Sequence, residues 1–143
     1  MTANPYRSDR VAMVLLLFIG WISAAQAEMA TGNSAVMNTQ NSQSALQKMA
    51  VIMHRLKHFP SPQSKDTLKQ IIEDKSTTAR QKDLATAIIN LNHRALVDDK
   101  IKLRKIMENQ NAPMDERDLA SIIYNLDHRP TKSDKSRLEQ MMQ

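Results

Sequence analysis

Three histidines recur at one interval along the chain and raise the question of metal chemistry. His58, His93 and His128 lie 35 residues apart, and three imidazoles are a known ligand set for zinc. Equivalent residues of stacked helical units, however, are expected on the order of 10 Å apart, whereas the ligands of one zinc ion lie about 2 Å from the metal. We therefore expect each histidine to cap or pack against the end of a helix, where an imidazole meets unpaired carbonyl groups.

Two further kinds of side chain could bind a metal ion or a stress-related ligand. His54 lies four residues before His58, which places both on one helix face, and methionine thioethers can bind copper(I). Methionines at such positions more commonly fill an aliphatic core. A periplasmic metal- or ligand-binding protein that uses these histidines and methionines is the alternative hypothesis, while the sequence predicts no cofactor and no metal site.

Catalytic arrangements of side chains are not evident in the sequence. The chain has no cysteine and no Gly-x-Ser-x-Gly motif, which removes thiol chemistry and the serine nucleophile elbow. Paired carboxylates such as Asp98 and Asp99 fall at predicted helix starts, where they complement the helix dipole. We therefore predict that the protein is not an enzyme.

The histidines belong to a repeat that runs through most of the chain. Residues 83–108 and 118–143 share 12 of 26 residues without a gap, and a weaker copy lies 35 residues upstream. A fixed period in this range indicates stacked helical units. The period resembles that of the tetratricopeptide repeat, which has 34 residues. That family's pattern of Trp, Leu-Gly, Tyr, Ala, Phe and Pro is missing, so its peptide-binding groove is not implied.

Each unit is predicted to contain two helices. Apolar residues recur every three or four positions, as at Leu119, Ile122 and Leu126, which is typical of a helix face and not of a strand. Prolines at positions 60, 62 and 130 favour a break between the two helices. The sequence therefore predicts an all-α fold of about three tandem 35-residue helix-loop-helix repeats, forming a small superhelix or a compact helical bundle.

Residues that cap the helices can also be predicted. The candidate N-caps are Asp98, Asp99, Ser133 and Asn111, because short polar side chains accept hydrogen bonds from the first turn. Asn90 and Asn125 lie near the ends of first helices, where a side-chain amide could lock one repeat to the next.

The first 47 residues differ in character from the repeats. Residues 1–27 combine arginines, an apolar run of about 14 residues and an Ala-Gln-Ala end, as in a secretory signal peptide cleaved near Ala27. Residues 28–47 are rich in Asn, Ser, Thr and Gln, which favours a flexible polar linker, with a helix beginning between Ser42 and Lys48. We expect a periplasmic or secreted domain over residues 48–143, with units 48–82, 83–117 and 118–143.

Most of the net positive charge lies in the first unit. Residues 48–82 contain eight lysines and arginines against three acidic residues, whereas six face six in the second unit and four face four in the third. The expected partner-binding basic patch comprises His54, Arg55, Lys57, His58, Lys65 and Lys69. Such a patch can steer and orient an anionic partner, and protonated histidines would raise its charge.

These features favour an exported binding protein. The leading hypothesis is a non-enzymatic adaptor, inhibitor, immunity factor or chaperone-like protein, whose basic first repeat contacts another protein with an anionic surface. Anionic envelope components are further candidate partners, and nucleic acid is disfavoured because stacking aromatic residues are scarce. Self-association through the C-terminal unit is also considered, since no capping helix follows the apolar residues Leu138, Met141 and Met142.

Overall fold

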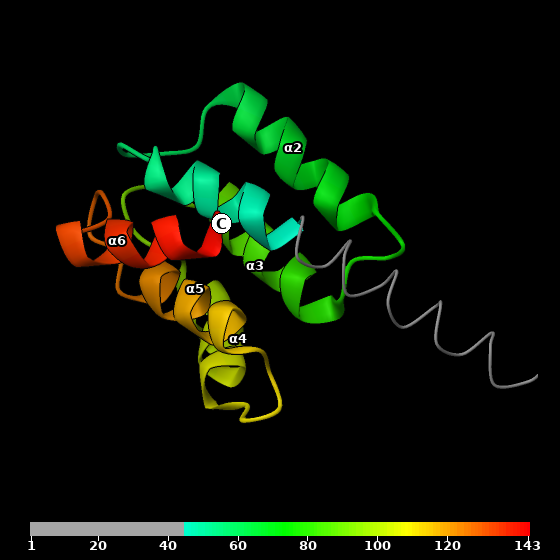
Figure 1. The fold of residues 1–143 in the computed structure, drawn as a ribbon. Coiled ribbons are helices and arrows are strands. Elements are labelled where there is room, and N and C mark those ends of the chain that lie inside the picture. The colour runs from blue at the N-terminus through cyan, green and yellow to red at the C-terminus, as the bar shows by residue number, and fades with distance from the viewer. Residues whose placement is uncertain (1–44) are drawn as a thin grey trace, which may run out of the picture.

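Six helices joined by short loops make up residues 45–143, the part of the chain that the computed structural model describes (Figure 1). The first helix covers residues 45–54 and is followed by α2 (Pro62–Glu73), α3 (Ala79–Ile89), α4 (Val97–Glu108), α5 (Met114–Tyr124) and α6 (Lys132–Met141). No strand forms within residues 45–143, so the predicted all-α fold is confirmed. The predicted signal peptide and most of the predicted linker lie outside the described residues.

The helix boundaries repeat at the interval seen in the sequence. α2 and α4 begin 35 residues apart, at Pro62 and Val97, and α3 and α5 begin at Ala79 and Met114 with the same offset. Most helical residues therefore have a counterpart 35 residues further along the chain, at the same position within a helix. Each residue can therefore be compared with the residues that lie 35 positions before and after it.

Counterpart positions build one aliphatic core. The fully buried sets are Met49, Leu84 and Leu119; Ala50, Ala85 and Ala120; Met53, Ile88 and Ile123; and Leu68, Leu103 and Leu138. The first helix, α3 and α5 each bury several residues, whereas α2, α4 and α6 bury one edge of each helix. Methionine fills two of these positions, and its flexible side chain suits an irregular core.

The last helix returns to the first. α2 packs on α3 and α4 packs on α5, while Nε2 of His54, at the end of the first helix, lies 3.0 Å from Oε1 of Glu139 in α6. Figure 1 shows α6 beside the first helix, drawn in cyan. Residues 45–143 therefore form a compact bundle in which segments distant in sequence are in contact.

The helix starts differ from most of the predicted caps. Ser61, Thr78 and Thr131 accept hydrogen bonds from the first turns of α2, α3 and α6, and the last two form capping boxes with Gln81 and Asp134. The predicted caps Asp98, Asp99 and Ser133 lie inside helices, and Asn111 precedes Pro113, which occupies the N-cap of α5. These four predictions are wrong, because Leu96, Pro113 and Thr131 occupy the N-cap positions.

Helix α4 lacks a side-chain cap. Leu96 occupies its N-cap position and accepts no hydrogen bond through its side chain, whereas the counterparts Ser61 and Thr131 do. An apolar residue in place of such a cap typically costs about 1 kcal/mol of stability. Helix α4 therefore lacks a stabilising hydrogen bond that α2 and α6 both have.

One buried ion pair joins α3 to α5. The side chain of Glu116 is only 3% exposed and accepts hydrogen bonds from Nε of Arg80, at 2.6 Å, and from Nε2 of Gln81, at 3.0 Å. Its two oxygens are thus both satisfied, which offsets the cost of removing a carboxylate from water. The contact fixes the starts of these two helices relative to each other.

We predict that the core positions dominate stability. Leu84→Ala should lower the free energy of unfolding by about 2–5 kcal/mol, because it leaves a cavity at a fully buried site. Chemical denaturation followed by circular dichroism measures this loss. The control Val97→Ala, at a site that is 77% exposed, should change stability by no more than about 0.5 kcal/mol. Equal losses for the two variants would contradict this core.

Candidate functional site

The three repeat histidines occupy loops at one end of the bundle. His58 follows the first helix, His93 follows α3, and His128 follows α5. All three loops lie at the left-hand side of Figure 1. We refer to the surface formed by loop residues 55–60, 90–95 and 125–130 as the histidine face.

Buried neighbours position each histidine. The residue two places before it is a buried leucine, at positions 56, 91 and 126, and the residue two places after it is a buried proline or alanine, at positions 60, 95 and 130. The chain is thus held at both ends of a five-residue stretch. The histidine between these anchors is left at the exposed surface.

Backbone hydrogen bonds connect the three loops. The N–H of His93 donates to the carbonyl of His58 at 3.1 Å, and the N–H of His128 donates to the carbonyl of His93 at 2.8 Å. His93 and His128 each have a φ of 66°, a left-handed conformation in which histidine is among the more common non-glycine residues. The residues in this conformation are the same two whose N–H groups donate to the preceding loop.

The three imidazole rings form a close cluster. Their centroids are separated by 5.2 Å for His58 and His93, 4.8 Å for His93 and His128, and 6.1 Å for His58 and His128. The expectation of a spacing near 10 Å is therefore wrong, because the loops converge instead of following one another in a row. The expectation of helix capping is wrong for His93 and His128, since Asn90 and Asn125 occupy the C-caps of α3 and α5. The three rings lie close to one another instead.

The amides of these two asparagines act within one segment. Nδ2 of Asn90 donates to Oδ2 of the buried Asp99 at 3.0 Å, which links the end of α3 to the start of α4. Nδ2 of Asn125 donates to the carbonyl of Ser121, one turn earlier in α5. The predicted link between repeats is made by the backbone hydrogen bonds of the histidines and not by these amides.

Asp127 connects two loops of the histidine face. Its Oδ1 lies 2.8 Å from Nδ1 of His128 and accepts a hydrogen bond from Nε of Arg94 at 3.0 Å. The hydrogen bonds of His128 and then of Arg94 hold the pKa of this carboxyl below the ordinary aspartate value. The carboxylate is thus already engaged by two neighbours.

The histidine face is strongly basic. Four cationic side chains occur in its three loops, and all are exposed: Arg55, Lys57, Arg94 and Arg129. Asp127 is the only acidic residue in these loops. Sequence reasoning missed Arg94 and Arg129, because it counted charge unit by unit and the second and third units are neutral overall. The signal was their position next to the recurring histidines.

The predicted basic patch is divided between two elements and the loop that joins them. Arg55, Lys57 and His58 lie in the first loop of the histidine face, whereas Lys65 and Lys69 lie on α2, where Nζ of Lys69 is 3.7 Å from Oδ1 of Asp66. His54 ends the first helix and contacts Glu139, as described above. The loop residues therefore join the new cluster, while Lys69 and His54 each have an acidic neighbour.

The alternative hypothesis of a metal- or ligand-binding protein stays a prediction. Within residues 45–143, no group of three or more His, Cys, Asp or Glu side chains is arranged to hold a metal ion. Met49, Met53 and Met141 are buried in the core, and Met107 and Met142 pack against it. These methionines therefore fill the aliphatic interior.

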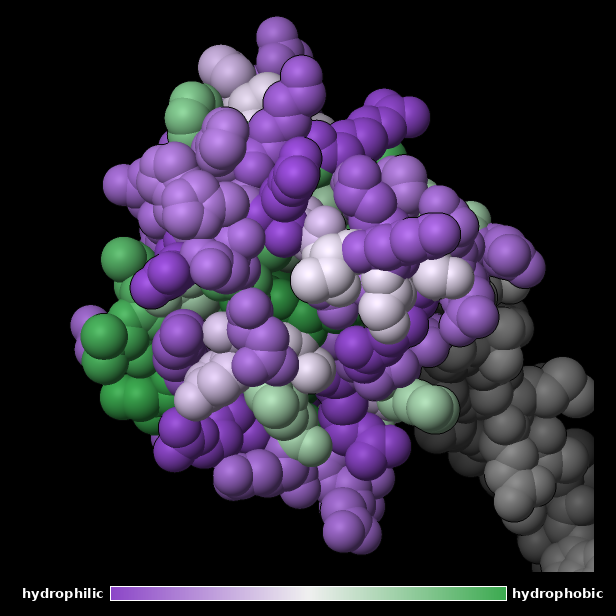
Figure 2. All heavy atoms as spheres, turned by 90° about the vertical axis from the view of Figure 1, so that its left-hand side faces the viewer, coloured by the Kyte–Doolittle hydropathy of each residue, from purple (hydrophilic) through white to green (hydrophobic). Residues whose placement is uncertain are grey.

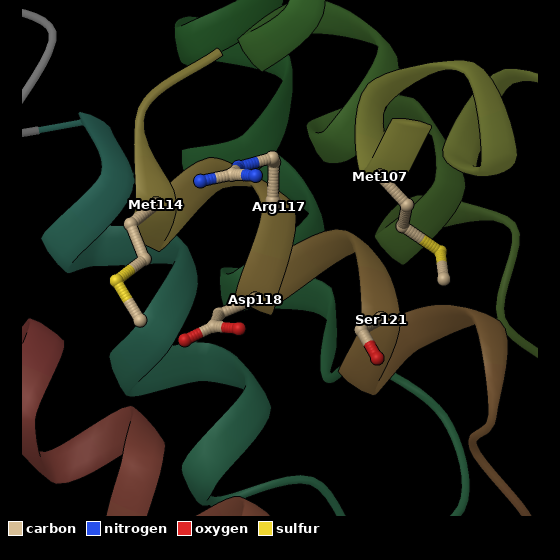
Figure 3. Close-up of a pocket in the computed structure, with 5 residues that line it drawn as sticks. All are labelled: Met107, Met114, Arg117, Asp118 and Ser121. Carbon is tan, nitrogen blue, oxygen red and sulfur yellow. The ribbon is translucent and has the colours of Figure 1, made fainter. Parts of the chain in front are cut away.

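A separate pocket lies between α4 and α5. It has a volume of roughly 280 Å³ and is lined by Met107, Met114, Arg117, Asp118 and Ser121 (Figure 3). Asp118 accepts a hydrogen bond from Arg137 of α6, and Oγ of Ser121 lies within reach of the Asn125 amide. The carboxylate of Asp118 is thus paired with an arginine, and the hydroxyl of Ser121 neighbours an amide. An amide is not the base that a serine nucleophile requires.

Within residues 45–143, no helix combines the length and the apolar character needed to span a lipid bilayer.

We predict a measurable shift for Asp127. Its carboxyl should titrate below the ordinary aspartate pKa in wild-type protein, and Arg94→Gln should move that pKa upward, as followed by NMR of the side-chain carbon. Because the folded-state pKa is lowered, the contribution to stability is present above the unfolded value and is lost as the pH falls through the folded value. The control Arg129→Gln should leave the titration unchanged, and an unshifted wild-type midpoint would refute the bridge.

Comparisons of this chain with protein-family models, with curated proteins and with solved structures find no match.

Proposed function

We propose that this chain is an exported, non-enzymatic helical-repeat protein that binds an acidic partner protein through the histidine face. Export is proposed from the leader-like residues 1–27 of the sequence. A binding role is favoured over catalysis because the described side chains offer a charged, exposed surface and no nucleophile with its base.

The three-repeat organisation is supported by the recurring helix bounds and by the packing order. The six helices divide into three hairpins: the first helix with α2, α3 with α4, and α5 with α6. The second helix of one hairpin packs on the first helix of the next, in the pairs α2 with α3 and α4 with α5. The contact between His54 and Glu139 links the last hairpin to the first. We propose three hairpins arranged around a common centre, with the histidine face at one end of that centre.

The convergence of the loops is the single observation that carries the proposal. Four exposed cationic side chains and three imidazoles meet on one face, and the single carboxylate among them is held by Arg94 and His128. Clustered positive charge raises the rate of encounter with an anionic partner and orients it.

An acidic protein fits this face better than nucleic acid does. Nucleic acid is disfavoured because Phe59 and Tyr124 are the only Phe, Tyr or Trp side chains in residues 45–143, too few to stack successive bases. Phe59 is 62% exposed and lies next to His58 in the histidine face. A folded partner can use such an apolar side chain together with the surrounding charges.

The experiment compares two sets of charge-neutralising variants. Arg55→Gln, Lys57→Gln and Arg129→Gln together should weaken binding of the captured partner by roughly tenfold or more at low salt, and should reduce the dependence of affinity on salt. The measurement is affinity capture of the tagged chain from its native envelope fraction, followed by binding assays with the identified partner.

The matched control removes the same charge away from the histidine face. Lys48, Lys75 and Lys82 lie on the first helix, in the α2–α3 loop and in the first turn of α3, so their replacement by glutamine should leave binding nearly unchanged. Equal loss of binding in the two triple variants would show that only net charge matters. Unchanged binding in both would refute the histidine face as the contact surface.

A further inference from the structure

An apolar surface lies at the start of α4, next to the histidine face. Leu96, Val97 and Ile101 are 51%, 77% and 55% exposed, and Leu96 comes three residues after His93 in the chain. Val97 and Ile101 are one helical turn apart, so their side chains lie on the same side of α4. Figure 2, which looks at the side of the molecule where the loops lie, shows an apolar area at one margin of a mostly hydrophilic surface. We call these three residues the α4 apolar patch.

The other two hairpins carry polar or small residues at the same positions. The counterparts in α2 are Ser61, Pro62 and Asp66, and those in α6 are Thr131, Lys132 and Ser136. The common fold therefore does not require apolar side chains here. The patch is a feature of the second hairpin alone, on a scaffold whose core positions are buried alike in all three.

The patch also replaces a structural contact. Leu96 stands where Ser61 and Thr131 cap their helices, and α4 has no side-chain cap of its own. A leucine at this site thus removes a cap and exposes apolar surface to water, and both changes are unfavourable for the isolated bundle. Covering the patch with a partner would recover the second loss.

Positive charge continues the same side of the helix. Arg104 and Lys105 follow Ile101 by three and four residues and are exposed, so they lie on the same side of α4 as the patch. Nη2 of Arg104 donates to the hydroxyl of Tyr124 at 2.7 Å, which holds this guanidinium in place. The surface thus passes from apolar side chains to Arg104 and Lys105 along the helix axis, and ends at Glu108 in the last turn.

We propose that the α4 apolar patch is the anchor site for a partner segment that presents apolar side chains followed by carboxylates. The proposal rests on the proposed function and gives the partner its chemistry. Two other occupants fit less well. Three side chains are too few for the roughly 800 Å² per subunit that a stable dimer buries, and Glu28 is the only charged residue of the chain's own residues 28–44.

The test places a photo-crosslinking amino acid at position 97 of the full chain in its native cells, with position 114 as the control. Met114 is also exposed, at 69%, but starts α5 at the end of that helix away from the histidine face. The expected result is a crosslink from position 97, and not from position 114, to a partner peptide in which apolar residues adjoin aspartate or glutamate. A crosslink to a second copy, to residues 28–44 or to a peptide without acidic residues would overturn the proposal, as would no crosslink above the control.

A variant designed from the third hairpin separates binding from folding. Leu96→Thr, Val97→Lys and Ile101→Ser together introduce the residue types found at 131, 132 and 136, and the new threonine can cap α4. The melting temperature should stay the same or rise, while affinity for a synthetic peptide of the crosslinked sequence should fall by roughly tenfold or more. Undiminished affinity would overturn the anchor site. If binding then still depends on Arg55, Lys57 and Arg129, the proposed function stands and only this inference fails.

Discussion

Two backbone hydrogen bonds connect the surface on which the candidate function depends. They run from His93 to His58 and from His128 to His93, and they bring together loops that are 35 residues apart in the chain. The two donating residues adopt a left-handed conformation, which costs a residue other than glycine roughly 1–2 kcal/mol. Such a cost persists only where the surroundings compensate for it, and the buried leucines before each histidine supply that support.

The convergence of the loops explains several features at once. It brings the ring centroids of successive histidines to 5.2 and 4.8 Å and places Arg94 against Asp127 of the next loop. It also lets residues 83–117 and 118–143, which carry no net charge, contribute arginines to a basic face. At the other end of α3 and α5, the buried Glu116 with Arg80 and Gln81 fixes the same two helices. Helices α3 and α5 are therefore held near both ends by polar contacts and along their length by aliphatic packing.

The sequence predicted the helices well and the geometry between them poorly. A 35-residue period with three- and four-residue apolar spacing depends on local repetition, so the all-α fold and the buried faces follow from it. The angle between successive hairpins leaves no periodic signal, which is why the histidine spacing was wrong. The caps at Asp98, Asp99, Ser133 and Asn111 were wrong for another reason: α4 and α5 begin after Leu96 and Pro113, which make no side-chain cap, so polar residues alone do not mark these helix starts.

Differences between counterparts carry more functional information than the shared positions. The buried sets are alike at positions 35 residues apart because packing requires them, whereas Leu96, Val97 and Ile101 depart from both of their counterparts without any gain in packing. Arg55 and Lys57 likewise have neutral or acidic counterparts, at Asn90 and Asn125 and at Asn92 and Asp127. Two of the four cationic side chains of the histidine face therefore lie in its first loop, and the exposed apolar residues lie beside its second loop.

The convergence of the three loops is tested most directly by NMR detection of scalar couplings across hydrogen bonds in the isotope-labelled protein. Cross peaks should link the amide nitrogen of His93 to the carbonyl carbon of His58, and that of His128 to the carbonyl carbon of His93, and both amides should exchange slowly with solvent. Absence of both cross peaks together with fast exchange at these two amides would contradict the histidine face and the binding surface built on it.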